Sequence, residues 1–273
     1  MSNLMKRVSV AALFIPLFLF ILIKGGIYLS SLFLVIANLS FLEYINIFFK
    51  DKDIKFKSFY FFLFFSYTIF FFIFNMNSTL LIISIYLFLI LGFGIFLLEN
   101  KKNLKGFTDY IAKFLLGYVY LMLPLYLLIK GDVIARAIGF GYHFILFYTL
   151  IIWINDTMAY FSGRLLGKHH FSFISPKKTI EGVIGGVLFS IIFSIIYHYY
   201  FNFLSLKHVI IISFLVSIIA VSGDLFESAL KRDKGIKDSS NIIPGHGGIL
   251  DRFDAFIYTA AIYYLYFYLF LFS

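Results

Sequence analysis

The 273-residue chain is 62% hydrophobic and 22% aromatic, and only 14% of its residues are charged. Soluble domains have about 45–50% apolar and about 25% charged residues, so a single water-soluble domain could not bury 39 Phe and 20 Tyr. The absence of Cys excludes disulfides, thiolate metal sites and Cys nucleophiles. We therefore expect an integral membrane protein with almost the whole chain in the bilayer.

In chain order, long apolar runs alternate with short polar clusters. A membrane-spanning helix needs about 20 mostly apolar residues. The runs predict an all-α, polytopic membrane bundle of about nine transmembrane helices. The predicted spans are residues 8–23, 27–49, 58–74, 79–98, 111–129, 137–160, 180–200, 208–230 and 254–272.

The net charge of +9 is unevenly distributed along the chain. Lys and Arg concentrate in cytoplasmic connections of membrane proteins. With a cytoplasmic N-terminus, 19 of the 23 Lys and Arg residues fall in cytoplasmic segments. Most of the positive charge is thus explained by topology, and no nucleic-acid partner is expected. We expect a multi-pass protein of the cytoplasmic membrane, with its C-terminus outside.

The polar residues of the second half are also clustered. Residues 153–182 and 222–254 combine Gly, Asp, Lys, Arg, His and Pro, whereas the first half has one carboxylate within a span, Glu43, a weaker candidate. We expect one membrane domain, 1–273, with N-terminal helices in 1–135 and a catalytic part in 136–273. Both polar clusters lie on the predicted cytoplasmic side, so they can form one site.

Two carboxylates of the second cluster lie in or beside an apolar run. An ionised carboxylate at the centre of a span costs about 2.5–3.5 kcal/mol, which argues for a purpose. Helical spacing puts Asp224, Glu227 and Lys231 on one face. A structural alternative is an internal ion pair, with Lys231 or Arg232, that only holds helices together.

The loop that follows has the composition of a polyphosphate site. Its glycines permit close backbone approach, so amide groups can converge on phosphate oxygens. A helix beginning near Asp251 adds its positive end. A plain loop is the alternative if the glycines are considered alone. The residues concerned are Gly245, Gly247 and Gly248 with the cations Lys231, Arg232 and Arg252.

Carboxylates beside such a loop suggest a magnesium ion. Mg²⁺ commonly binds one or two carboxylates together with substrate phosphates and water. Asp224, Asp251 and Asp254 can supply ligands from two helices. Phosphoryl or nucleotidyl transfer then depends on positioning and charge neutralisation. His246 is either a general acid/base or phosphate donor, or an ordinary turn residue.

The first cluster allows both functional and structural interpretations. Asp156 lies on a predicted helix, and Lys177 and Lys178 precede another. The lysines contact phosphates, mark topology or contact acidic lipids. Thr179 is a candidate helix cap, and the three glycines of residues 182–186 favour close helix packing.

The spacing of these residues resembles a known family. The segments Ser228-Ala-Leu-Lys-Arg, Lys237-Asp and Ile243-Pro-Gly-His-Gly-Gly-Ile-Leu-Asp-Arg-Phe-Asp resemble the signature of the phosphatidate cytidylyltransferase family, also called CDP-diacylglycerol synthases. Residues 222–228, 156–160 and 175–179 are similar to other parts of the family pattern. The resemblance covers roughly the C-terminal 120 residues.

This resemblance implies transfer of a cytidylyl group from CTP to phosphatidic acid, forming CDP-diacylglycerol and pyrophosphate. It implies Mg²⁺, with a second cation such as K⁺ left open, a membrane-lipid environment and a homodimer. The implied catalytic residues are Asp224, Asp251, Lys231, Arg232 and His246. The implied substrate-binding residues are Lys178, Lys231, Arg232, Gly245, Gly247, Gly248 and Arg252. The implied metal ligands are Asp224 and Asp251, supported by Asp254, Glu227 and Asp156.

There are three alternative functions. A CTP-dependent transferase acting on a prenyl lipid phosphate would use similar chemistry, because the acceptor is selected by helices that the sequence describes poorly. A CDP-alcohol phosphotransferase is disfavoured, because Asp132 and Arg136 lack the following Gly and the later paired Asp. A transporter or channel could use Asp224 and a Gly-rich re-entrant loop for cations, without any need for CTP.

Overall fold

The computed structural model describes the backbone of residues 3–74, 78–99, 104–243 and 247–272, and the side chains of 12–72, 83, 85–97, 104–243 and 247–272. Within these ranges the chain folds into nine helices and no strand. The prediction of an all-α bundle is confirmed. The helices are α1 (Asn3–Lys24), α2 (Gly26–Phe48), α3 (Ile54–Phe74), α4 (Ser78–Glu99), α5 (Phe107–Ala137), α6 (His143–Leu166), α7 (Ile180–Phe201), α8 (Leu206–Asp233) and α9 (Leu250–Phe270).

Seven of the described helices are long and apolar enough to span a membrane. The described parts of α1 and α4 contribute shorter apolar segments, Ala12–Lys24 and Ile85–Leu97. The polytopic character expected from composition is therefore confirmed.

Two helices differ clearly from their predicted bounds. α5 continues past residue 129 because Asp132 and Arg136, one turn apart, form an ion pair at 2.7 Å. Arg136 also donates to the carbonyls of Leu22 and Ile23 at the end of α1. α6 begins later than residue 137, after a turn with two positive-φ glycines, and extends to residue 166. Asp156 consequently lies in the helix body.

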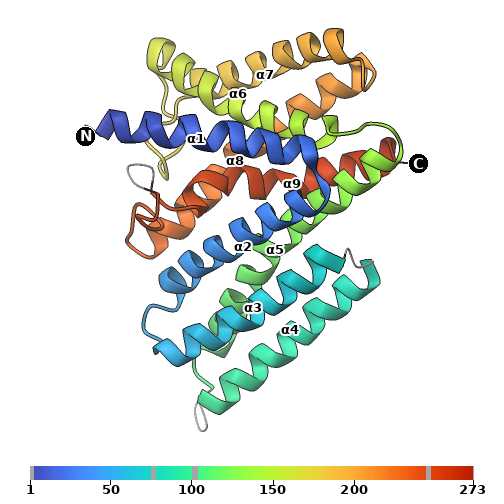
Figure 1. The fold of residues 1–273 in the computed structure, drawn as a ribbon. Helices are drawn as coiled ribbons and strands as arrows, with labels where there is room; N and C mark the ends of the chain where they lie inside the picture. The colour runs from blue at the N-terminus through green and yellow to red at the C-terminus, as the bar shows by residue number, and fades with distance from the viewer. Residues whose placement is uncertain (1–2, 75–77, 100–103, 244–246, 273) are drawn as a thin grey trace.

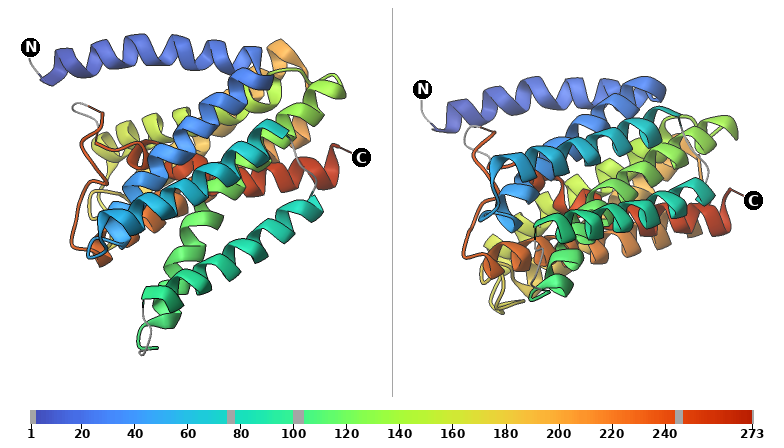
Figure 2. Two further views of the ribbon diagram at one scale, coloured as in Figure 1. Left: turned by 60° about the horizontal axis from the view of Figure 1, so that its bottom comes forward. Right: turned by 90° about the horizontal axis from the view of Figure 1, so that it is seen from below.

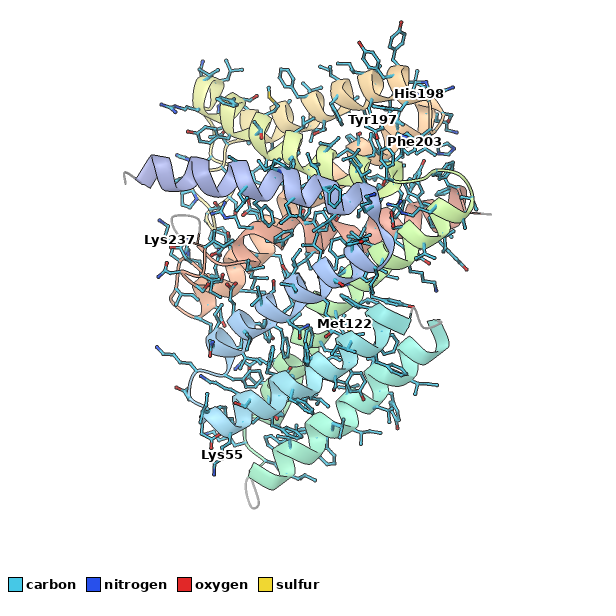
Figure 3. All side chains as sticks on the ribbon, viewed as in Figure 1. Lys55, Met122, Tyr197, His198, Phe203 and Lys237 are labelled. Carbon is cyan, nitrogen blue, oxygen red and sulfur yellow. The ribbon has the colours of Figure 1, made fainter. Side chains whose placement is uncertain are left out.

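The connections separate to the two ends of the bundle. The N-terminal end of α1, the 167–179 connection and the described parts of the α8–α9 connection lie at one end, and the C-terminal end of α9 lies at the other (Figures 1 and 2). Figure 3 places Lys55 and Lys237 toward the first end and His198 and Phe203 toward the second. This grouping agrees with the sidedness that the basic residues predict.

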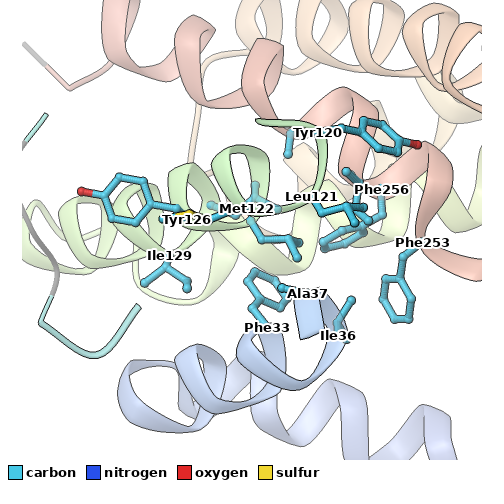
Figure 4. Close-up of a cluster of buried hydrophobic side chains, with 14 of the residues drawn as sticks. Phe33, Ile36, Ala37, Tyr120, Leu121, Met122, Tyr126, Ile129, Phe253 and Phe256 are labelled. Carbon is cyan, nitrogen blue, oxygen red and sulfur yellow. The ribbon is translucent and has the colours of Figure 1, made fainter. Parts of the chain in front are cut away.

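Aromatic side chains fill the contacts between helices. Figure 4 shows part of the core, where side chains from α2, α5 and α9 meet. Phe33 and Phe256 lie edge to face, with ring centroids 5.7 Å apart. Two buried tyrosine hydroxyls bond to neighbouring helices: Tyr44 donates to the Lys113 carbonyl at 2.7 Å, and Tyr263 to the Phe144 carbonyl at 2.6 Å. Van der Waals packing and such hydrogen bonds hold helices together in lipid, where apolar burial gives little net drive.

Candidate active site

A cavity of about 600 Å³ lies among α6, α7, α8 and α9, and both polar clusters of the sequence line it. The expectation that the two clusters form one site is confirmed. Six carboxylates and five cations face this space, so its formal charge is close to neutral. The charged lining residues are Asp156, Asp224, Glu227, Asp238, Asp251 and Asp254 with Arg164, Lys177, Lys178, Lys231 and Arg252.

Close packing of α6 against α7 forms one wall. A Cβ at Gly185 would lie 2.1 Å from the Ser162 hydroxyl oxygen, and a Cβ at Gly186 would lie 2.8 Å from Oδ1 of Asn155. Thr179 is the N-cap of α7 and accepts a hydrogen bond from the Gly182 amide at 3.1 Å. The structural interpretations of the glycines and of the threonine are both confirmed. They bring Asp156 on α6 beside the start of α7.

Lys178 crosses from this wall to α8. Its ammonium lies 2.5 Å from Oδ2 of Asp224, and neither side chain is fully buried. Asp224 also interacts electrostatically with Asp156 across the cavity. Asp224, in the body of α8, therefore pairs with Lys178 from the connection before α7, and not with Lys231 or Arg232 as suggested from the sequence.

Lys231 is the centre of a buried ionic cluster. Its ammonium lies 2.6 Å from Oε2 of Glu227, one turn earlier on α8, and 2.7 Å from Oδ1 of Asp251 on α9. The side chains of Glu227 and Asp251 are 1% and 7% exposed. The structural alternative of an internal Glu227–Lys231 pair is thus present in the molecule. The same pair also lines the cavity, so the two interpretations are compatible.

Behind these pairs, buried oxygens lack hydrogen-bond donors. Oε1 of Glu227 and the hydroxyl of Tyr120 have no hydrogen-bond partner among the residues that the structure describes. Asp254 interacts electrostatically with Asp224, Glu227 and Asp156. A buried carboxylate oxygen without a donor, beside other carboxylates, is costly unless a cation joins them.

This donor set fits magnesium. The described residues contain no group of three or more His, Cys, Asp or Glu that could hold a metal by themselves. Mg²⁺ keeps several waters and usually binds one or two carboxylates plus phosphates. The carboxylates around Asp224 therefore suit an ion that arrives with a polyphosphate. Their roles as metal ligands stay predictions.

Asp251 also organises the loop before α9. Besides Lys231, its carboxylate accepts hydrogen bonds from the amides of Ser239, at 3.0 Å, and Gly248, at 2.9 Å. Gly247 has φ +87°, and a Cβ there would lie 2.8 Å from Asp251. Neither Gly247 nor Gly248 lines the cavity. The Gly248 amide thus donates to Asp251. Phosphate binding by these glycines stays a prediction.

The remaining predicted residues separate into three cases. Arg252 lines the cavity. Arg232 does not: it is exposed and donates to the carbonyl of Ile236 at 2.6 Å, where it closes the end of α8. Gly245 and His246 lie outside the described residues.

Two groups at the site were not predicted from the sequence. Asp238 lines the cavity and belongs to the Lys237-Asp238 segment of the quoted pattern, which could have identified it. Tyr120 lies on α5 and interacts electrostatically with Asp254 and Glu227. Nothing distinguishes it in the sequence from the 19 other tyrosines.

Comparison with known proteins decides the family. The model of a family described as "Cytidylyltransferase family" matches residues 5–270. The chain belongs to this family. Over 121 residues it is 45% identical to the phosphatidate cytidylyltransferases of Staphylococcus haemolyticus and Staphylococcus saprophyticus, and 43% identical to that of Staphylococcus aureus strain COL. In each case the match covers 44% of this chain and 46% of the relative, so it spans about half of either protein.

Proposed function

We propose that this member of the cytidylyltransferase family transfers a cytidylyl group from CTP to phosphatidic acid. The observation that carries the proposal is the cavity between apolar helices, lined by nearly equal numbers of carboxylates and cations. A lipid phosphate can reach such a cavity from the bilayer and a nucleotide from water. The names of the relatives, each a phosphatidate cytidylyltransferase, support the same reaction.

The reaction needs no covalent enzyme intermediate. A phosphate oxygen of phosphatidic acid attacks the α-phosphorus of CTP, a new P–O bond forms, and the bond to the β-phosphate oxygen breaks. Pyrophosphate leaves and CDP-diacylglycerol remains in the membrane. Positioning and charge neutralisation account for most of the catalysis in transfers of this type.

The chain's cations are placed to bind phosphates. Lys178, Lys231 and Arg252 line the cavity from the start of α7, from α8 and from α9. They counter the charge of two anionic substrates that would otherwise repel each other. Carboxylates hold two of these ammonium groups in fixed positions, which limits reorganisation when substrates bind.

Asp224, with Asp156, Glu227, Asp251 and Asp254 around it, would hold Mg²⁺. When bound, the ion would neutralise phosphate charge and stabilise the transferring phosphoryl group. A second cation such as K⁺ is part of the proposal for the same carboxylates. We further propose that the site faces the cytoplasm at the cytoplasmic membrane and that the protein forms a homodimer.

The test uses the whole chain, purified in detergent, with phosphatidic acid and Mg²⁺. CTP labelled at the α-phosphate should give a label in the lipid fraction, whereas CTP labelled at the γ-phosphate should release it as pyrophosphate. Lipid label from γ-labelled CTP would instead indicate a kinase. No lipid label from α-labelled CTP, with acceptor and metal present, would refute the proposal. Competition with prenyl-glycerol phosphate tests the acceptor.

A further inference from the structure

We infer that Glu43, on α2, is a positioning residue for the active site; the inference rests on the proposed function. Glu43 belongs to the N-terminal half of the chain and does not line the cavity. Its side chain is buried, at 2% exposure. Across about 200 residues of sequence it contacts the connection between α8 and α9 and the first residue of α9.

Four donors converge on this carboxylate. Oε2 accepts from the Ser239 hydroxyl at 2.8 Å and from the Leu250 amide at 2.9 Å. Oε1 accepts from the Ser240 hydroxyl at 2.6 Å and from the Ile249 amide at 2.9 Å. An ionised carboxylate has about four acceptor sites, so Glu43 is saturated. It has no capacity left for a metal or a substrate, which assigns it a positioning role.

The local sequence explains why a remote carboxylate is needed. The first amides of a helix have no partner within the helix. The N-cap of α9 is Ile249, whose side chain cannot accept a hydrogen bond. Glu43 supplies the missing acceptor for two of these amides and places a negative charge at the positive end of α9. Burial of an unpaired carboxylate becomes acceptable because every acceptor site is used.

The anchor continues directly to the cavity. The Ser239 amide donates to Asp251, and Asp251 accepts from Lys231. Gly248 packs against this contact with no room for a side chain. A Cβ there would lie 1.9 Å from the Ser239 hydroxyl oxygen and 2.5 Å from Oε2 of Glu43. A chain of contacts thus runs from α2 through Ser239 to Asp251 and Lys231. Loss of Glu43 should shift these two groups without removing either.

The test is Glu43→Gln, which keeps size but turns an –NH₂ group toward two donors. We expect kcat to fall on the order of 10–100-fold while the KM for CTP changes less than about threefold, because misplacement of catalytic groups by about 1 Å has costs of this size. The double variant Ser239→Ala/Ser240→Ala removes two donors and keeps two amides, so its effect should be smaller. It also serves as the test if Glu43→Gln does not fold.

A second measurement reports on the anchor without any catalysis. The chain has no Cys, so Ile242→Cys, at an exposed position, can carry a single spin label in the connection before α9. Glu43→Gln should make this label more mobile. Asp109→Asn, a matched change at an exposed ion pair with Lys113, should leave both mobility and kcat unchanged.

The outcomes are separable. Unchanged label mobility in Glu43→Gln overturns the anchor. Increased mobility with unchanged kcat overturns the positioning role, as does a loss of activity fully explained by a smaller folded fraction. If the parent chain transfers no cytidylyl group, the proposed function fails, and the label mobility still decides whether Glu43 holds the connection.

Discussion

The ionic cluster around Lys231 gives the sharpest stability prediction. Its ammonium lies 2.6 Å from Glu227 and 2.7 Å from Asp251, so the two carboxylate oxygens are at most about 5.3 Å apart. Lys231→Met removes the cation and leaves two buried carboxylates facing each other. At this separation, with an effective dielectric constant of about 20, their repulsion is about 3 kcal/mol. Breaking a buried ion pair typically costs about 3–5 kcal/mol, in agreement.

We therefore expect Lys231→Met to lower the free energy of unfolding by about 3 kcal/mol. Glu227→Gln added to Lys231→Met removes one of the two opposed charges and should recover most of the loss. Lys231→Arg is the matched control that keeps the charge. Such recovery is the signature of coupled residues in a double-mutant cycle.

Thermal unfolding can be followed through Trp153, the single tryptophan, whose ring packs against Phe18 at 5.8 Å. A Lys231→Met protein as stable as the parent would refute the reasoning. So would a double variant no more stable than Lys231→Met. Either result would mean that the three side chains do not form a coupled cluster.

Four further results are expected. Gly185→Ala should destabilise the chain by about 1–3 kcal/mol, because the added Cβ meets Ser162; Gly94→Ala, with open space around it, is the control in the same unfolding measurement. Lys178→Met should reduce the transfer rate more than Arg232→Met, because Lys178 lines the cavity and Arg232 does not. Equal losses would contradict this geometry. Chelation of divalent cations should abolish transfer, and added Mg²⁺ should restore it; activity in excess chelator would exclude the metal role. A reporter fused after Ser273 should lie outside the cytoplasm, and an inside signal would mean that the number of spans is even.

Much of the fold follows from the sequence because lipid imposes a simple rule. Only helices and closed barrels satisfy the backbone in lipid, and apolar runs of about 20 residues indicate helices, so the helix count was predictable. The ends of α5 and α6 were not, since they depend on contacts with other helices, such as Arg136 with the carbonyls that end α1. No local pattern encodes that contact.

The site was predictable where charge stands out against an apolar background. Asp224, Glu227 and Lys231 were recognised because ionised groups in a span need a reason. Which cation pairs with which carboxylate was not predictable, because the Lys178–Asp224 contact joins segments far apart in sequence. Glu43 was noticed for the same reason as Asp224, but its four donors belong to the α8–α9 connection and the first residue of α9, about 200 residues away.

The near balance of carboxylates and cations in the cavity also bears on how substrate arrives. A strongly basic mouth would attract a nucleotide over a Debye length and make the association rate fall steeply with ionic strength. A balanced lining gives little such steering, so capture should depend on short-range contacts and vary little with salt. Discrimination would then take place inside the cavity, where Lys178 and Lys231 must each exchange a carboxylate partner for a phosphate of the substrate.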